Sequence, residues 1–196
     1  MSHHTILKSS HMWLDDAIVS ATQFLLKNKY VHIRGLQPPI LAQKLALTRD
    51  PQPSQEFIQV LCASGSHWIM VSTVRCPANT INVYDSMNLR LSSTNEKVIA
   101  DLLRCTERDI TVNYVQVQYQ SGGSDCGLFA LAFATSICNG VDPANVIYQQ
   151  DKMREHLIKC LEEEDVTLFP QRGSRRANSK RTCSVKLLVF LHLSAT

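Results

Sequence analysis

Cys126 stands where a polar loop meets an apolar segment. Residues 118–125 are mostly polar and include two glycines, whereas residues 128–134 are apolar throughout. A helix that begins at this cysteine would place partial positive charge beside the sulfur, which favours the thiolate. The loop supplies backbone N–H groups and a glutamine amide that could bind an oxyanion. The order of loop, thiol and helix start therefore predicts a nucleophilic cysteine.

A thiol nucleophile also needs a base within hydrogen-bond reach and an acid that orients the base. His67 follows a Gly-Ser turn and opens a predicted strand, and Asp85 closes the next predicted strand. If the two strands form an antiparallel hairpin, these side chains become near cross-strand neighbours, with Cβ atoms about 4.5–5.5 Å apart when directly opposed. The aspartate would then fix the tautomer of the histidine. The spacing predicts a site made of Cys126, His67 and Asp85.

Each of these residues has a plainer interpretation when it is taken alone. Cys126 could be a buried apolar filler, as free cysteines often are, while His67 could be a surface residue and Asp85 a turn residue. Their order on the predicted elements favours the catalytic interpretation. Four other cysteines lie in apolar or helical contexts, where we expect no acid–base partner: Cys62, Cys105, Cys138 and Cys160.

Hydrophobic periodicity and turn residues predict the elements that position this site. Strands are predicted over residues 57–61, 67–74, 81–85 and 110–117. Helices are predicted over residues 13–25, 96–104, 126–138 and 152–163, with a further helix start at Asp142-Pro143. In the first helix Asp15 or Asp16 is the expected N-cap, and the expected core-facing side chains are Leu14, Ala17, Ile18, Ala21, Phe24 and Leu25. Together these elements predict an α+β fold.

Composition limits the class of protein. The chain has 196 residues, of which 44% are hydrophobic and 19% charged, which fits one globular domain. No apolar run approaches the roughly 20 residues that span a membrane, and the N-terminus lacks the order of a secretory signal. Seven widely spaced cysteines without a CxxC pair argue against a disulfide framework or a zinc site. We expect reduced thiols, no metal or cofactor, and a place in the nucleus or cytoplasm.

The charge is distributed unevenly along the chain. Residues 171–196 carry six basic and no acidic side chains, so 14 of the 20 basic and all 17 acidic residues fall in residues 1–170. We therefore expect a loose segment at residues 1–11, a domain over residues 12–170 and a basic, disordered tail at residues 171–196. The tail could make weak contact with nucleic acid or an import receptor. Its apolar end, residues 185–191, could add a strand or a helix, or be a non-native end of the coding sequence.

The motifs together resemble the ubiquitin-like-protein-specific proteases, the SUMO-protease type of cysteine peptidase, whose clan includes the adenovirus protease. The resemblance covers about residues 13–170 and is closest to compact, diverged members that are often linked to mobile elements. It is carried by five pieces of the sequence: Trp13-Leu14-Asp15-Asp16, His67-Trp68, Tyr84-Asp85-Ser86, Gln120 and Asp125-Cys126-Gly127-Leu128-Phe129. The fold that it implies is papain-like, with a central, mostly antiparallel sheet packed against the helix that Cys126 opens.

The resemblance also implies roles for single residues. Cys126 would attack the scissile carbonyl, His67 would transfer the proton and Asp85 would orient His67. Gln120, with the backbone N–H of Cys126, would form the oxyanion hole, although the nearby Gln118 is an alternative donor. The residues implied in substrate binding are Trp13, Asp15, Asp16 and Trp68. The two flat tryptophan rings could line a narrow tunnel and exclude every residue but glycine from it.

The reaction implied by the resemblance is hydrolysis of a peptide or isopeptide bond after the Gly-Gly end of a ubiquitin-like modifier, by a monomer. One alternative is a catalytically silent module that binds a modifier or serves a transposon complex. A second alternative is a cysteine-dependent acyltransferase, which would need a pocket for an acyl-CoA with a cluster of basic residues in the domain, and the sequence shows no such cluster. The two alternatives stay open on the sequence alone.

Overall fold

The computed structural model describes residues 3–40, 56–63, 66–93, 95–96, 98–99, 109–174 and 183–188. The elements run along the chain in a mixed order of helices and strands. They are α1 (His3–Lys8), α2 (Asp16–Lys29), β1 (Arg34–Gly35), β2 (Phe57–Ala63), β3 (His67–Ser72), β4 (Thr80–Tyr84), β5 (Asp109–Val115), α5 (Cys126–Cys138), the 3-10 turn η1 (Pro143–Asn145), β6 (Val146–Tyr148), α6 (Gln150–Glu162), β7 (Gln171–Ser174) and β8 (Cys183–Leu188).

A six-stranded sheet forms the centre of the molecule, in the order β1-β2-β3-β4-β5-β8. The pairs β2–β3, β3–β4 and β5–β8 are antiparallel, while β1–β2 and β4–β5 are parallel. A separate two-stranded sheet pairs β6 with β7. The predicted α+β fold with a mostly antiparallel central sheet is therefore confirmed.

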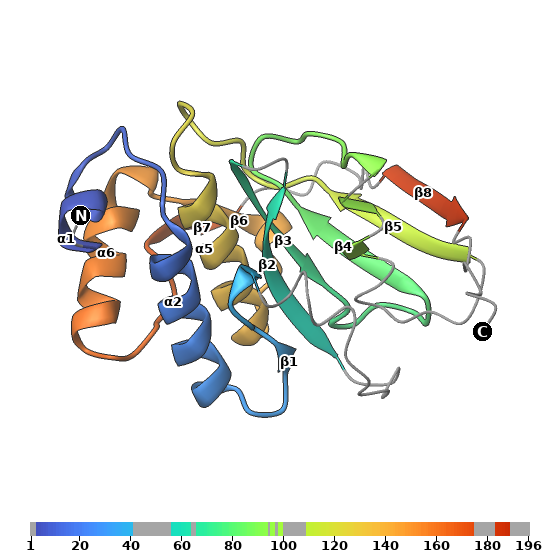
Figure 1. Ribbon diagram of the computed structural model, residues 1–196, viewed down its shortest axis with the longest axis horizontal. Helices are drawn as coiled ribbons and strands as arrows, with labels where there is room; N and C mark the ends of the chain where they lie inside the picture. The colour runs from blue at the N-terminus through green and yellow to red at the C-terminus, as the bar shows by residue number, and fades with distance from the viewer. Residues whose placement is uncertain are drawn as a thin grey trace, which may run out of the picture.

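Helix α5 lies between the sheet and the helices α1, α2 and α6 (Figure 1). Its residues are apolar on every side and almost all are buried, as is expected of a helix enclosed by other elements. Alternate residues of β2 and β3 divide between the two faces of the sheet. Val60, Trp68 and Met70 belong to the core around α5, whereas Leu61 and Ile69 belong to a second core on the opposite face.

Both ends of the chain differ from the expectation. The segment expected to be loose forms α1, which packs on α6 and buries Ile6 and Leu7. The tail expected to be disordered contributes β7 and β8, of which β8 lies at the edge of the main sheet (Figure 1). None of these short segments carries a periodic pattern in the sequence, and each forms its element against a partner that is distant in sequence, namely α6, β6 or β5. The rest of the tail, residues 175–182 and 189–196, lies outside the described residues.

Smaller differences concern the helices. Asp142 caps only the 3-10 turn η1, and the chain then enters β6 before α6 begins. In α2 the N-cap is Asp15, as expected, but Phe24 is exposed and the polar Thr22 and Gln23 are buried instead. Residues 101–104 of the helix expected over 96–104 lie outside the described residues. Within the described residues, none of the helices combines the length and apolar character needed to cross a membrane.

Candidate active site

His67 and Asp85 meet at the end of the β3–β4 hairpin. The ladder pairs Met70 with Tyr84 and Ser72 with Asn82, so Asp85 lies one residue beyond the last pair of the ladder. On this register Asp85 is offset by two residues from direct opposition to His67. The two side chains span the diagonal, and His67 Nε2 lies 2.7 Å from Asp85 Oδ1. The expected pairing is therefore confirmed, although it is diagonal rather than direct.

The Asp85 carboxylate is fixed by the turn that follows it. Oδ1 also accepts a hydrogen bond from the backbone N–H of Met87 at 2.8 Å, and Oδ2 accepts one from that of Leu89 at 2.8 Å. The side chain of Asp85 is almost fully buried. A carboxylate with both oxygens held in this way presents one orientation to the imidazole, as an orienting acid should.

The His67 imidazole lies between the carboxylate and the thiol. Burial alone would lower its pKa, but hydrogen bonds to Asp85 and to Cys126 outweigh burial and raise the pKa of His67 to about 9. Because Nε2 faces Asp85, Nδ1 is the ring nitrogen left for the sulfur. The structure thus brings Cys126, His67 and Asp85 into one chain of contacts, as the spacing predicted.

Cys126 is the first residue of α5 and only 2% exposed. Leu14 packs closely on the start of the helix, since a Cβ added to Gly127 would lie 3.1 Å from three Leu14 atoms. Glycine after the cysteine therefore allows the segment that precedes α2 to cover the first turn of α5.

Gln120 lies in the loop before Cys126 with its amide buried and oriented. Its Oε1 accepts a hydrogen bond from Ser86 Oγ at 2.6 Å, and its Nε2 donates to the carbonyl of Gly122 at 2.9 Å. The backbone N–H of Gln120 also donates to the carbonyl of Ser86 at 2.9 Å. Because a carbonyl can only accept, these contacts fix which end of the amide is the NH₂ group. Ser86 belongs to the Tyr84-Asp85-Ser86 motif, but no role for it followed from the sequence. In the structure it donates the hydrogen bond that holds the amide oxygen of Gln120.

Gln118, the alternative oxyanion donor, is engaged elsewhere. Its Oε1 accepts a hydrogen bond from the backbone N–H of Tyr148 at 2.6 Å, and its Nε2 donates to the Tyr148 carbonyl at 3.2 Å. Both ends of this amide tie the loop to β6. The Gln120 amide is instead held by Ser86 and by Gly122 within the loop that leads to Cys126, so Gln120 stays the candidate donor.

The residues implied in substrate binding differ in their surroundings. Trp13 is 52% exposed and its indole N–H donates to the Gly123 carbonyl at 3.0 Å, whereas Trp68 is 5% exposed and donates to the Leu14 carbonyl at 3.0 Å. The side chain of Asp15 caps α2 through the N–H of Ile18. Asp16 is largely exposed. The pKa of its carboxyl is raised, first by its partial burial and then by the charge of Asp15. Trp13 and Asp16 are thus accessible, while Trp68 and Asp15 also have structural roles.

Two further thiols lie near titratable groups. Cys62 lies near Cys126, and its pKa is raised by burial first and then by the charges of Cys126 and Asp16. Cys160 Sγ lies 3.3 Å from His156 Nε2 on α6, so the expectation that this cysteine lacks an acid–base partner was wrong. A helix places residues four apart on one face, which the sequence could have shown. Cys105 lies outside the described residues.

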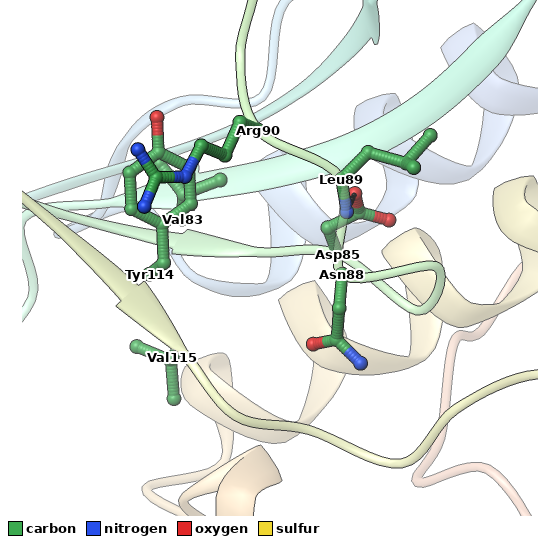
Figure 2. A pocket seen from close by; sticks show the side chains of 7 residues that line it. All are labelled: Val83, Asp85, Asn88, Leu89, Arg90, Tyr114 and Val115. Carbon is green, nitrogen blue, oxygen red and sulfur yellow. Dashed lines mark hydrogen bonds between the residues drawn. The ribbon is translucent and has the colours of Figure 1, made fainter. Parts of the chain in front are cut away.

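Figure 2 shows a small pocket next to Asp85, on the β4–β5 side of the carboxylate. Its lining residues are Val83, Asp85, Asn88, Leu89, Arg90, Tyr114 and Val115. The pocket borders the turn that holds the carboxylate, and its lining does not include Cys126 or His67. Across the described ranges, no three His, Cys, Asp or Glu side chains gather as metal ligands would.

Comparison with known proteins gives structural matches without sequence matches. No protein-family model matches the chain, and no curated protein is significantly similar to it in sequence. A solved structure of the SUMO protease Ulp1, with its catalytic cysteine oxidised to a sulfonic acid, superposes with a TM-score of 0.66 at 14% identity, and the match covers 83% of each chain. The C-terminal Ulp1 protease domain in complex with Smt3, the yeast ortholog of SUMO, gives 0.63 at 13% identity over 82% of each chain.

A third match comes from another organism. The catalytic domain of the Ulp1-like SUMO protease of Chaetomium thermophilum gives a TM-score of 0.56 at 19% identity, over 78% of this chain and 73% of that one. At these identities the likeness concerns the fold. The chain therefore has the α+β fold of the Ulp1-type SUMO protease domains, as the motifs led us to expect.

Proposed function

We propose that the protein is a cysteine-type peptidase of the ubiquitin-like-protein-specific family, which hydrolyses a peptide or isopeptide bond after the Gly-Gly end of a ubiquitin-like modifier. The observation that carries the proposal is the chain of contacts from Cys126 through His67 to Asp85, at the first residue of a buried helix. The fold shared with Ulp1 supports it, since one of those structures holds Smt3 in complex.

In the proposed reaction His67 takes the proton of Cys126, and the thiolate attacks the carbonyl carbon of the last glycine. A protonated imidazole stabilises a neighbouring thiolate, and the raised pKa of His67 means that the imidazole holds its proton at neutral pH. Asp85 keeps the ring oriented while this charge is present.

Attack turns the carbonyl oxygen into an oxyanion. The donors proposed for it are the second hydrogen of Gln120 Nε2 and the backbone N–H of Cys126. Since the first hydrogen of Gln120 Nε2 is used by Gly122, the amide is already oriented before substrate arrives, which is how such sites lower the barrier.

Collapse of this intermediate breaks the C–N bond, and His67 gives its proton to the leaving amine. The glycine is then held as a thioester on Cys126. Water, activated by neutral His67, attacks the thioester, and the modifier leaves with a free carboxylate while the thiol regains its proton. The selection of glycine would depend on Trp13, which donates to the carbonyl of Gly123 in the loop before Cys126, and on Trp68, which donates to the carbonyl of Leu14 in the segment before α2.

The test is covalent labelling with a panel of ubiquitin-like proteins that carry a C-terminal vinyl sulfone. We expect one modifier to label the wild-type protein and the Cys160→Ala variant, and to leave Cys126→Ala unlabelled. Cys160→Ala is the matched control because it also removes a thiol beside an imidazole. Failure of every probe on a folded protein would favour a silent binding module, and labelling by acyl-CoA analogues alone would favour acyl transfer.

A further inference from the structure

The carboxylate of Asp125, the residue before Cys126, is held by two side chains of α6. Arg154 donates to Asp125 Oδ1 from Nη2 at 2.6 Å and from Nε at 3.1 Å, and Gln150 Nε2 donates to Oδ2 at 2.7 Å. Gln150 and Arg154 are four residues apart and so share one face of the helix. The side chains of Arg154 and Asp125 are only 12% and 13% exposed, so this is a largely buried, hydrogen-bonded ion pair.

Asp125 also occupies the N-cap position of α5, where an aspartate normally accepts a hydrogen bond from the first turn. Here it makes no such bond and has φ −99° and ψ 10°. The contrast within the same molecule is Asp15, which has φ −84° and ψ 169° and accepts from the N–H of Ile18 at 2.9 Å. The carboxylate of Asp125 is therefore turned away from the helix that Cys126 opens, and toward α6.

The negative charge of the Asp125 carboxylate also bears on the reactivity of Cys126. A free carboxylate beside a thiolate disfavours the thiolate, because like charges repel. The other titratable groups that face Cys126 are His67 from β3 and Cys62 from β2, with Asp16 of α2 near Cys62. Asp125 directly precedes Cys126 in the sequence, and Arg154 supplies the opposite charge that balances it.

The same two α6 residues bind the surrounding backbone. Arg154 donates to the carbonyls of Ile6 at 3.2 Å and Met12 at 2.7 Å. Gln150 donates to the carbonyl of Ser121 at 2.7 Å and accepts from its N–H at 2.8 Å. The N-terminal segment, the loop before Cys126 and α6 are thus joined at one point.

We propose that Arg154, with Gln150, is a positioning residue that keeps the Asp125 carboxylate off the N-terminus of α5 and neutralises its charge, so that the first-turn N–H groups serve the Cys126 thiolate and the oxyanion. The inference rests on the proposed peptidase function for its purpose. The arrangement itself acts on the thiol and can be measured without any substrate.

The test is the rate of alkylation of Cys126 by iodoacetamide as a function of pH, followed by mass spectrometry of the peptide that contains it. In Arg154→Met we expect the rate at neutral pH to fall about fivefold to tenfold, the size of a strong charge effect at a helix end, and the pH midpoint to rise. The double variant Arg154→Met with Asp125→Asn should regain most of the rate, because the uncompensated carboxylate is gone. Lys152→Met, which removes an exposed positive charge from the same helix, should match the wild type.

A purely structural role for Arg154 predicts another pattern. The melting temperature of Arg154→Met would fall, while the pH midpoint would stay at the wild-type value and Asp125→Asn would not restore the rate; that pattern overturns the inference. If Arg154→Met does not fold, Arg154→Lys, which keeps the charge and loses the paired geometry, is used and should show a smaller shift of the same sign. An unchanged midpoint in Arg154→Lys at a reduced melting temperature would also contradict the proposal. Failure of all modifier probes would remove the proposed function without affecting this measurement.

Discussion

Two thiols in the described part of the chain lie beside an imidazole, and their settings differ. Cys126 is the first residue of α5, and its imidazole partner His67 comes from β3 and is bound by the Asp85 carboxylate. Cys160 lies near the C-terminal end of α6, and its partner His156 is one turn earlier on the same helix. The first pair is built from three separate parts of the chain, whereas the second is a local contact.

The local pair is occupied by structural contacts. His156 Nε2 also faces the carbonyl of Thr167 at 3.1 Å, and its ring packs on Phe169. The pKa of Cys160 is lowered, because contacts with His156 and Thr167 outweigh the effect of burial, which would raise it. The C-terminal end of a helix carries partial negative charge, which disfavours the thiolate form of a cysteine placed there.

On the proposed function, contact between a thiol and an imidazole is not enough to make a nucleophile. The Cys126 pair adds a helix N-terminus, the Asp85 carboxylate beside the imidazole and the Gln120 amide that we propose as an oxyanion donor. Variants that remove these additions one at a time should lower activity, and matched changes near Cys160 should not.

The largest effect after loss of the thiol itself is expected from Asp85→Asn. Without the carboxylate the His67 ring loses its orientation and the partner of its positive charge, so kcat for hydrolysis of a fluorescent Gly-Gly amide of the modifier should fall about 10³-fold or more. Asp165→Asn is the matched control near the Cys160 pair, since it breaks only the exposed contact with Lys29. Equal activities of the two variants would remove Asp85 from the mechanism.

Gln120→Ala should have the next largest effect. Loss of one oxyanion donor typically lowers kcat about 10²-fold to 10³-fold, with KM little changed because the contact forms mainly in the transition state. Gln118→Ala is the control, because its amide pairs with the backbone of Tyr148 and should cost about 1–3 kcal/mol of stability instead. If Gln118→Ala lowers kcat and Gln120→Ala does not, the assignment of the donor is wrong.

The smallest effect concerns stability against pH. The pKa of His67 is raised from 6.5 to about 9 in the folded protein, so the folded state binds more protons than the unfolded state between these values. The stabilisation is present in full below pH 6.5 and is lost as pH rises toward about 9. The free energy of unfolding, measured with urea across this window, should fall as pH rises. This slope should be reduced more in His67→Gln than in His156→Gln. The pKa of His156 is also raised, chiefly by the hydrogen bond to Cys160. Identical slopes in wild type and His67→Gln would contradict the charged pair.

Much of the site could be predicted because it depends on elements with clear patterns. The β3 and β4 strands, the turn between them and the apolar helix that begins at Cys126 each have a strong periodic or turn signal. The position of Asp85 near His67 followed from them. The diagonal offset did not, since it depends on the register of the ladder and on the turn that binds the carboxylate.

The residues that sequence reasoning missed act through contacts distant along the chain. Gln23 is buried in α2 because Gln59 and the backbone of Val60 and Gln37 satisfy its amide, and this network replaces the apolar stripe expected there. Arg154 reaches Asp125 and the N-terminal segment over separations of 29 to 148 residues. A hydrophobic pattern cannot show such polar contacts, because their partners are fixed only by the tertiary fold.

The most direct test of the central claim compares the thiols of the native protein in one reaction. With a limiting amount of iodoacetamide at pH 7, we predict that Cys126 carries most of the label and that Cys160 carries at most about a tenth as much, because Cys126, unlike Cys160, combines an oriented imidazole with a helix N-terminus. The preference should disappear in Asp85→Asn. Labelling of Cys160 or of Cys138 as fast as that of Cys126 would contradict the account.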